Sequence, residues 1–315
     1  MRYLVTGGAG FIGSNTVDEL VRRGHGVVVL DDLSSGKEEN LAEVRNKITF
    51  VKGSITDLEA VQKAMHQAEY VIHLAARTSV PRSIKDPLDT NRINVEGTLN
   101  VLLAARDNKV RRLIFAASSA AYGETLELPK TESMRPEPIS PYGVTKYIGE
   151  LYAHVFGRCY GLETACLRYF NIFGPRQDPD SPYSGVLSRF AMAFLEGQQP
   201  VVFGDGQQTR DFTYVDNAVQ ANLLACEAPS ASGVFNVGTG SRVSLNQTLE
   251  LLRRISRKDL EAKYEPPREG DIRDSQADIA KAREILGYDP TVLFEEGLER
   301  TFEWYRANHL KNTAK

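Results

Sequence analysis

A tyrosine, a lysine and a serine near the middle of the chain have residue types and a spacing that suit proton transfer. Tyr142 and Lys146 are four residues apart, just after Pro141, and on a helix such residues share one face. A nearby ammonium favours the phenolate and lowers the tyrosine pKa from its usual value of about 10. Ser118 adds a hydroxyl where an apolar run at 113–117 ends. Alone, the spacing is also typical of an ordinary helix surface; together with the features below, it predicts a general base at Tyr142.

A glycine-rich turn near the N-terminus predicts a site for nucleotide phosphates. Gly7, Gly10 and Gly13 follow an apolar run at 3–5 and open a segment with helical spacing at 11–23. Glycines permit the tight turn and the close backbone approach that a pyrophosphate requires, and the helix N-terminus presents free N–H groups to it. The alternative is a structural turn that binds no ligand.

Asp31 follows the second predicted strand, at 27–30, where a carboxylate can accept hydrogen bonds from an adenosine ribose. A carboxylate there repels the additional phosphate of NADP, so the sequence favours NAD. Asp32 is expected to contribute, whereas Lys37 slightly weakens the exclusion of NADP. The alternative for Asp31 is a loop carboxylate without a ligand.

These residues stand among alternating strand-like and helical patterns. Apolar runs at 3–5, 27–30, 48–51, 71–75 and 113–117 alternate with helical patterns at 11–23, 58–68 and 91–107. Such alternation predicts βαβ units and a parallel sheet that is buried on both faces and binds ligands at the carboxyl ends of its strands. The expected fold class is therefore α/β, with a doubly wound Rossmann sheet.

Beyond about residue 170, prolines and glycines interrupt the chain more often. A strand is expected there at 200–203, and helices at 186–196 and 294–306. We therefore expect an NAD-binding domain over 1–170, to which later segments return, and a smaller mixed α/β substrate domain over 171–315.

The composition narrows the class of protein. The formal net charge is −3, without the basic excess that nucleic-acid binders usually carry. The three cysteines form no Cys-x-x-Cys pair, which argues against a disulfide framework or a zinc site, and no metal is expected. No apolar run approaches the roughly 18 residues needed to cross a membrane. We expect a cytoplasmic protein that binds neither nucleic acid nor membranes.

From residue 6 to about residue 290 the chain resembles the extended short-chain dehydrogenase/reductase family, and within it the nucleotide-sugar 4-epimerases. The resemblance rests on the turn at 6–13, on Ser118 four residues before Tyr122, on the spacing of Tyr142 and Lys146, and on the run at 168–171. It implies NAD as the cofactor and Ser118, Tyr142 and Lys146 as the catalytic residues.

The resemblance also implies two sets of binding residues. The cofactor set comprises Gly7, Gly10, Phe11, Ile12, Gly13, Asp31, Asp32, Ser35, Gly36, Ser54, Ile55, Leu74, Ala75, Ala76, Asn94, Tyr142, Lys146 and Tyr169. The substrate set comprises Ser79, Ser118, Ser119, Asn171, Val186, Phe203, Arg210, Arg268, Asp271 and Ser275. Phe203 resembles a residue that packs on uracil. Arg210, Arg268 and Asp271 resemble a clamp on the diphosphate and ribose, for which bidentate arginines are well suited. For each arginine the alternative is a surface ion pair.

The chain departs from the family pattern at a few positions. Ser54 stands where an aspartate often binds the adenine amino group, so a weaker hold on adenine is expected, and Thr78 stands in place of a lysine. The related 4,6-dehydratases carry an Asp-Glu pair where this chain has Ser119 and Ala120, and the glutamate usual in decarboxylases near residue 120 is absent too. These differences favour epimerisation over dehydration and decarboxylation.

The activity implied by the resemblance is NAD-dependent 4-epimerisation of a UDP-hexose through a transient 4-keto sugar, with UDP-glucose and UDP-galactose as substrates. In the family, a small residue at the place of Ser275 admits N-acetylated sugars, which implies UDP-N-acetylglucosamine and UDP-N-acetylgalactosamine as well; a loop position far from the sugar is the alternative. A homodimer through helices near 90–107 and 142–158 is also implied. A dehydratase, decarboxylase or reductase relative and a non-catalytic NAD(H)-binding regulatory protein stay open as alternatives.

Overall fold

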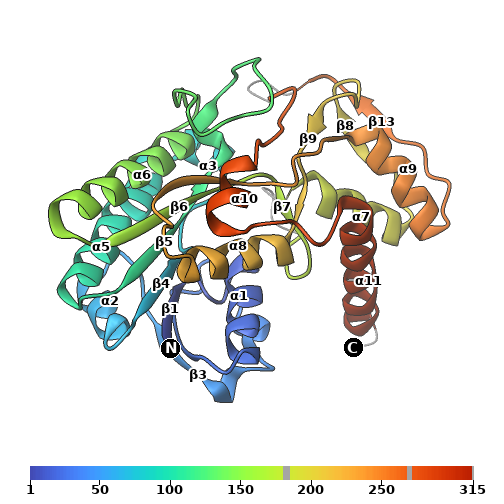
Figure 1. The fold of residues 1–315 in the computed structure, drawn as a ribbon. Coiled ribbons are helices and arrows are strands. Elements are labelled where there is room, and N and C mark those ends of the chain that lie inside the picture. Colours follow the sequence, from blue (N-terminus) through green and yellow to red (C-terminus); the bar gives the residue numbers. More distant parts are fainter. Residues whose placement is uncertain (180–184, 268–271, 314–315) are drawn as a thin grey trace.

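The computed structural model describes residues 1–179, 185–267 and 272–313, and a seven-stranded parallel sheet forms the centre of this part of the chain (Figure 1). The order β11-β6-β5-β4-β1-β2-β3 joins β1 (Arg2–Thr6), β2 (Gly26–Asp31), β3 (Ile48–Lys52), β4 (Tyr70–His73), β5 (Arg112–Ser118), β6 (Glu163–Tyr169) and β11 (Gly233–Val237). Every adjacent pair is parallel. The predicted doubly wound sheet is confirmed. Its winding direction reverses between β1 and β4, the place at which such sheets bind ligands.

Helices cover both faces of the sheet because successive apolar strand residues point to opposite sides. On one face Tyr3 and Val5 share a core with α1 (Phe11–Arg22) and α8 (Val215–Glu227). On the other face Leu4 packs in a second core with residues of α2 (Leu58–Met65), α5 (Gly97–Asp107) and α6 (Pro141–Tyr160). Figure 1 shows α5 and α6 side by side on that face.

Local chemistry fixes where α6, the helix that carries Tyr142, begins and ends. The Ser140 hydroxyl caps it by accepting a hydrogen bond from the Gly143 N–H at 3.1 Å. Pro141 occupies the first turn, where its missing N–H leaves no bond unmade. Gly161 ends the helix in the left-handed conformation, at φ 71°. The catalytic candidates on α6 therefore stand on a rigid element.

A buried ion pair fixes α6 to the sheet. Glu150, on the inner side of the helix, accepts hydrogen bonds from the Arg168 guanidinium of β6 at 2.8 and 2.7 Å. Only 3% of each side chain is exposed. The pair holds the helix against β6, two turns along from Tyr142.

The later part of the chain forms short sheets and helices beside the main sheet. The described strand pairs are β7 (Ile172–Phe173) with β10 (Thr213–Tyr214), β8 (Val201–Phe203) with β13 (Lys263–Glu265), and β9 (Thr209–Arg210) with β12 (Val243–Ser244). The accompanying helices are α7 (Val186–Glu196), α9 (Leu245–Ser256), α10 (Ala280–Leu286) and α11 (Phe294–Thr313). In Figure 1, α9 and α11 lie on the side of the molecule away from α5 and α6.

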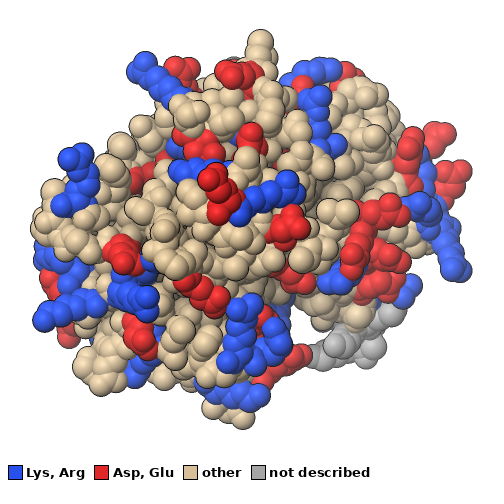
Figure 2. All heavy atoms as spheres, viewed as in Figure 1, with Lys and Arg blue, Asp and Glu red and all other residues tan. Residues whose placement is uncertain are grey.

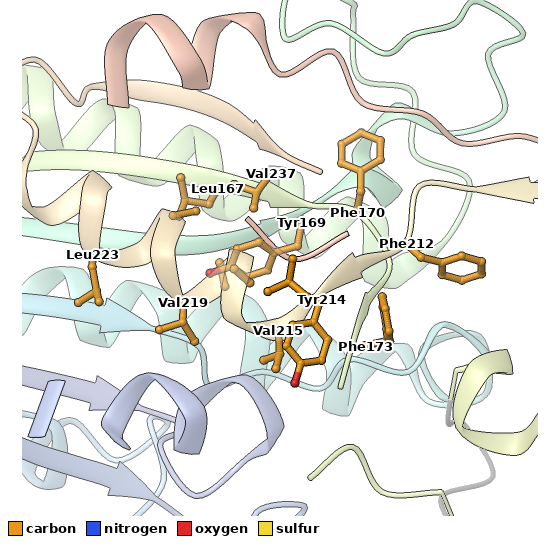
Figure 3. Packing of buried hydrophobic residues seen from close by; sticks show 14 of the residues in the cluster. Leu167, Tyr169, Phe170, Phe173, Phe212, Tyr214, Val215, Val219, Leu223 and Val237 are labelled. Carbon is orange, nitrogen blue, oxygen red and sulfur yellow. The ribbon is translucent and has the colours of Figure 1, made fainter. Parts of the chain in front are cut away.

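One hydrophobic core connects the main sheet with these shorter elements. Strand β11 and helix α8 lie after residue 170, yet both pack on the sheet. Figure 3 shows Val219 and Leu223 of α8 in the same cluster as Leu167 and Val237 of the strands. Phe212 and its aromatic neighbours extend the cluster toward the small sheets.

Several predicted elements have boundaries that differ from the structure. The helix expected at 294–306 continues to Thr313. The strand expected at 71–75 ends at His73, where the chain turns. The helix expected at 58–68 ends at Met65, because Gln67 has a positive φ of 60°. The helix expected at 91–107 follows α3 (Val80–Lys85) and α4 (Pro87–Asn91) and contains a π-helical turn at Arg92–Glu96 before α5.

The surface in Figure 2 carries basic and acidic side chains interspersed with one another on the face shown. Within the described ranges, no helix has the length and apolar character needed to traverse a bilayer. The same residues contain no group of His, Cys, Asp and Glu side chains placed to hold a metal ion. All three cysteines are free thiols.

Candidate active site

The structure brings Ser118, Tyr142 and Lys146 together at the carboxyl end of β5. Ser118 is the last residue of β5, and its hydroxyl lies near enough to the Tyr142 side chain to lower the pKa of the phenol. The Lys146 ammonium lies 6.0 Å from the centre of the Tyr142 ring and donates to the Ala116 carbonyl oxygen at 2.8 Å. A phenol with a hydroxyl partner and a buried ammonium nearby form an arrangement that can transfer a proton.

Burial dominates the electrostatics of this group. It raises the pKa of Tyr142, and the nearby Ser118 hydroxyl opposes that rise. Burial lowers the pKa of Lys146 to about 8, while the Glu150 carboxylate acts in the opposite direction. The expectation that Lys146 lowers the Tyr142 pKa is wrong for the protein alone. The ammonium donates to Ala116 rather than to the phenol, so desolvation outweighs its charge.

The glycine turn lies between β1 and α1, at the same edge of the sheet as this group but separated from β5 by strand β4. Gly7 has a φ of +69°, and the Gly10 N–H donates to the Gly7 carbonyl oxygen at 3.1 Å. A Cβ on Gly13 would overlap that same carbonyl oxygen. Helix α1 begins after Gly10, and no side chain caps its first N–H groups. Phe11 and Ile12 form its first turn. The turn therefore combines close backbone packing with free donors, which suits a pyrophosphate.

Asp31 ends β2 and is held rigidly. Its two carboxylate oxygens accept hydrogen bonds from the N–H groups of Ala9, at 2.9 Å, and Leu33, at 2.8 Å. Burial raises its pKa, and these two bonds lower it. Gly36 passes so close that a Cβ there would lie 3.0 Å from an Asp31 oxygen. Each carboxylate oxygen keeps a second lone pair, so Asp31 can still accept from a ribose hydroxyl.

The other residues of the loop after β2 are more open. Asp32 accepts from the Ser34 N–H at 2.9 Å, and Ser35 is exposed. Lys37 forms a 3.5 Å ion pair with Asp178, which draws its charge away from Asp31.

Arg77 is a functional candidate that sequence reasoning missed. Its guanidinium donates to the Ser34 hydroxyl at 2.8 Å and to Asp89 at 3.3 Å, so it spans from the turn after β4 to the loop after β2. In the sequence, the cation singled out near Asp31 is Lys37. Because β2 and β4 lie on either side of β1 in the parallel sheet, the segments that follow them end at the same edge. A cation that reaches the loop after β2 can therefore come from the turn after β4, as Arg77 does.

The turn after β4 and its supports carry several predicted cofactor residues. The N–H groups of Leu74 and Ala75 donate to Thr6, and Ala76 follows them. The Asn94 side chain bonds both the N–H and the C=O of Arg77, at 2.7 and 3.0 Å, and the Thr145 hydroxyl at 3.0 Å. Through these bonds Asn94 holds the turn after β4 in place and joins it to α6.

Ser54 and Ile55 lie after β3, on the other side of β1. The Ser54 hydroxyl pairs with the Thr56 hydroxyl at 2.9 Å. Ile55 is buried against Gly97 at the start of α5, where an added Cβ would collide with its side chain.

Tyr169 is the register partner of Ser118 across β5 and β6, and its hydroxyl donates to Asn222 at 2.6 Å. Its backbone therefore lies beside Ser118, while its hydroxyl is engaged in the core (Figure 3).

The predicted substrate residues lie on several elements. Asn171 follows β6 with a φ of 38° and donates to the Asp211 carbonyl oxygen at 3.1 Å. Arg210 on β9 donates to the carbonyl oxygens of Thr209 and Arg273. The Ser275 N–H donates to the Thr209 carbonyl oxygen at 3.1 Å, so Ser275 runs alongside Arg210. The remaining positions are Ser79 at the cap of α3, Ser119 after β5, Val186 at the start of α7 and Phe203 at the end of β8. Arg268 and Asp271 lie outside the described residues.

Asp211 is a second residue that the sequence analysis missed. Its buried carboxylate accepts from Thr239, Gly240 and Ala277, at 2.8 to 3.1 Å. It thereby ties the segment that carries Ser275 to the loop after β11. The sequence signal for Asp211 is its place between Arg210 and Phe212. A carboxylate that is buried at such a position needs hydrogen-bond partners.

Comparison with known proteins agrees with this geometry. Residues 3–238 match the NAD dependent epimerase/dehydratase family. The chain is 41% identical to a UDP-glucose 4-epimerase of Mycolicibacterium smegmatis, over 97% of this chain and 99% of that one. A solved UDP-glucose 4-epimerase of Thermotoga maritima with UDP-glucose is 45% identical, with a TM-score of 0.94 over 98% of this chain and 100% of the other.

A second solved structure is similar over the same length. It is a UDP-N-acetylglucosamine 4-epimerase from Methanobrevibacter ruminantium in complex with UDP-N-acetylmuramic acid, 40% identical, with a TM-score of 0.94 over 98% of each chain. The family match covers well over half of the chain, and the relatives match nearly all of it. This chain belongs to the NAD dependent epimerase/dehydratase family.

Proposed function

We propose that the protein is an NAD-dependent 4-epimerase of UDP-hexoses. The observation that carries the proposal is that Ser118, Tyr142 and buried Lys146 converge at the carboxyl end of β5, the same edge of the sheet at which the glycine turn follows β1. The cofactor residues are those that follow β1, β2, β3 and β4, together with Tyr142, Lys146 and Tyr169. When bound, NAD accepts and returns a hydride at the sugar C4.

The chain's own residues would handle the proton and the substrate. Tyr142 removes the proton of the 4-hydroxyl, and Ser118 hydrogen-bonds the same oxygen and relays the proton. Lys146 holds the nicotinamide ribose and keeps a positive charge near the phenol. The 4-keto sugar then turns over within the site and receives the hydride on its other face.

The substrate would be held at its uridine and diphosphate ends. Phe203 packs on the uracil, and Asn171 and Val186 line the nucleotide. Arg210, together with Arg268 and Asp271, clamps the diphosphate and ribose, since guanidinium groups bind phosphate oxygens bidentately. Ser79, Ser119 and Ser275 face the hexose.

The alternatives are disfavoured by specific residues. A dehydratase or decarboxylase needs a carboxylic acid next to the catalytic serine, and Ser119 and Ala120 provide none. A reductase relative and a non-catalytic NAD(H)-binding regulator stay as competing hypotheses. A regulator that only binds NAD(H) has no use for a tyrosine held between a serine hydroxyl and a buried lysine.

One experiment separates these functions. The purified protein is incubated with NAD⁺ and, in turn, UDP-glucose, UDP-galactose and their N-acetylated forms, and the C4 epimers are separated by chromatography. We expect interconversion with no net change in NAD⁺. Net consumption of the dinucleotide, release of carbon dioxide or a dehydrated product would each point to another reaction.

We expect NAD⁺ to bind more than about 10²-fold more tightly than NADP⁺, because like charges placed close together cost several kcal/mol. Asp31→Ala should narrow this gap, whereas Asp107→Asn, an exposed change on α5, should leave it intact. Titration of each variant with NAD⁺ and with NADP⁺ measures the ratio of the two affinities. Equal affinities in the wild type would refute the role of Asp31. A preference for NAD⁺ that survives Asp31→Ala would point instead to the neighbouring carboxylate of Asp32, because a cation such as Arg77 attracts the additional phosphate of NADP⁺ rather than repelling it.

Ser275→Tyr should suppress the conversion of UDP-N-acetylglucosamine roughly 10- to 200-fold and spare that of UDP-glucose, because added bulk in a full pocket penalises the larger substrate. Both kcat/KM values are measured for each variant. Ser230→Tyr is the matched control: it is exposed, before β11, and so lies at the opposite edge of the sheet. Equal loss of both activities would show that Ser275 does not select the sugar.

We also propose a homodimer through the outer faces of α5 and α6. Leu151 and Val155 lie one turn apart on α6, with 48% and 46% of their surface exposed. Sedimentation should give twice the 35.0 kDa chain mass. The double change Leu151→Glu/Val155→Glu should yield monomers, while Leu293→Glu, an exposed leucine before α11, should not. A wild-type monomer would exclude the dimer.

A further inference from the structure

His73 is a buried titratable residue that the proposed reaction does not use. It ends β4, directly before the Leu74–Ala76 turn, and 1% of its surface is exposed. Its Nδ1 lies 2.7 Å from the Thr6 hydroxyl on β1, and its Nε2 lies 3.0 Å from the Thr98 hydroxyl on α5. The ring therefore joins the strand before the glycine turn to a helix on the face that carries α6.

The neighbouring bonds determine the tautomer of this ring. The Thr98 hydroxyl donates its hydrogen to the Asn94 carbonyl oxygen at 2.6 Å, so it can only accept from His73. Nε2 must then carry the hydrogen. Nδ1 is left as an acceptor and takes the hydrogen of the Thr6 hydroxyl, which itself accepts from the Ala75 N–H at 3.3 Å.

The same series of bonds continues to the catalytic tyrosine. Asn94, whose carbonyl oxygen accepts from Thr98, donates through its side-chain amide to the Thr145 hydroxyl at 3.0 Å. That hydroxyl donates to the Tyr142 carbonyl oxygen at 2.8 Å. From Ala75 to the Asn94 carbonyl oxygen, and again from the Asn94 amide to Tyr142, every donor points the same way, so that neighbouring bonds within each stretch polarise one another. Asn94 joins the two stretches through its main chain and its side chain.

Protonation of His73 would disrupt the series, because Nδ1 would become a donor and the Thr6 hydrogen would lose its acceptor. Burial and the nearby Lys146 charge lower the His73 pKa to about 3. The neutral Nε2–H form is therefore present throughout the physiological range of pH.

We propose that His73 is a positioning residue that couples the strand before the glycine turn to Tyr142 through Thr98, Asn94 and Thr145. The proposal rests on the proposed function for its catalytic consequence. The series sets the position of Tyr142 relative to the glycine turn, and hence relative to the nucleotide that the turn holds. Small misplacement of a catalytic group lowers rates steeply.

Thr98→Val tests the coupling, because it keeps the shape of the side chain and removes the hydroxyl at the centre of the series. We expect kcat to fall about 10- to 100-fold with KM for the UDP-sugar unchanged, and Thr98→Ser to restore kcat. Thr301→Val is the matched control. Thr301 is equally buried and donates to a carbonyl four residues back, Gly297, but lies on α11 outside the series. Equal kcat in Thr98→Val and Thr301→Val, at equal loss of stability, would overturn the proposal.

Two readouts do not depend on turnover. In ¹⁵N-histidine-labelled protein, long-range ¹H–¹⁵N spectra should show His73 as the Nε2–H tautomer, with shifts constant from pH 5 to 8. In ¹³Cζ-tyrosine-labelled protein, Thr98→Val should shift the Tyr142 resonance, assigned with Tyr142→Phe, and Thr301→Val should not. An Nδ1–H tautomer or an unmoved Tyr142 signal would refute the coupling. Absent epimerase activity with these signals as expected would refute only the proposed function.

Discussion

Replacing Tyr142 by phenylalanine is expected to lower kcat by about 10²- to 10⁴-fold while leaving NAD binding and the fold nearly unchanged. The change removes only the hydroxyl that lies near Ser118, and the ring keeps its place on α6. Loss of the proton acceptor affects the transition state rather than substrate binding, so KM should change little. Epimerisation of UDP-glucose measures the rate, and a fluorescence titration measures NAD binding.

Tyr152→Phe is the matched control for this change. Tyr152 lies on the same helix, ten residues further along and thus roughly 15 Å away, and it packs against the second core. The control should retain wild-type kcat. Near-normal epimerisation by Tyr142→Phe would exclude Tyr142 as the base.

Glu150→Gln should lower the free energy of unfolding by about 3–5 kcal/mol, the usual cost of leaving one charge of a buried pair without its partner. The variant keeps the shape of the side chain but leaves the Arg168 guanidinium uncompensated in the core. One of its nitrogens, Nη1, has no partner among the described residues even in the intact pair. Urea denaturation measures the effect.

Two companion variants sharpen this test. Glu296→Gln breaks the exposed i,i+4 pair with Arg300 and should cost at most about 1 kcal/mol. The double change Glu150→Met/Arg168→Met removes both buried charges and should recover most of the lost stability. A loss below 1 kcal/mol for Glu150→Gln would mean that water reaches Arg168.

The main sheet was predictable because its strands are short apolar runs that differ in period from the helices between them. The strands at 27–30, 48–51 and 113–117 all belong to the parallel sheet, and the helices predicted at 11–23 and 186–196 are α1 and α7. Boundaries were less predictable where one residue's backbone conformation ends an element. Hydrophobic periodicity does not reveal the positive φ at Gln67 or the π-helical turn at Arg92–Glu96.

The meeting of Ser118, Tyr142 and Lys146, the candidate catalytic group, was predictable because local rules place its members: a serine at a strand end, and a tyrosine and lysine four apart on a capped helix. The raised pKa of Tyr142 was not, because it depends on burial by residues distant in sequence. The contacts of Arg77 with Ser34 and of Asp211 with Ala277 join segments 43 and 66 residues apart. Pairings at such separation follow from the three-dimensional path of the chain, which residue spacing does not encode.

The place of β11 in the sheet has a consequence for synthesis on the ribosome. Strand β6 is complete at Tyr169, but its neighbour β11 ends at Val237, about 70 residues later. At the usual 5–20 residues per second, the outer edge of β6 stays unpaired for roughly 3–14 s. An open apolar edge strand can pair with another nascent chain. The emerging protein therefore has a time window in which translation speed and chaperone capture of the β6 edge govern its yield.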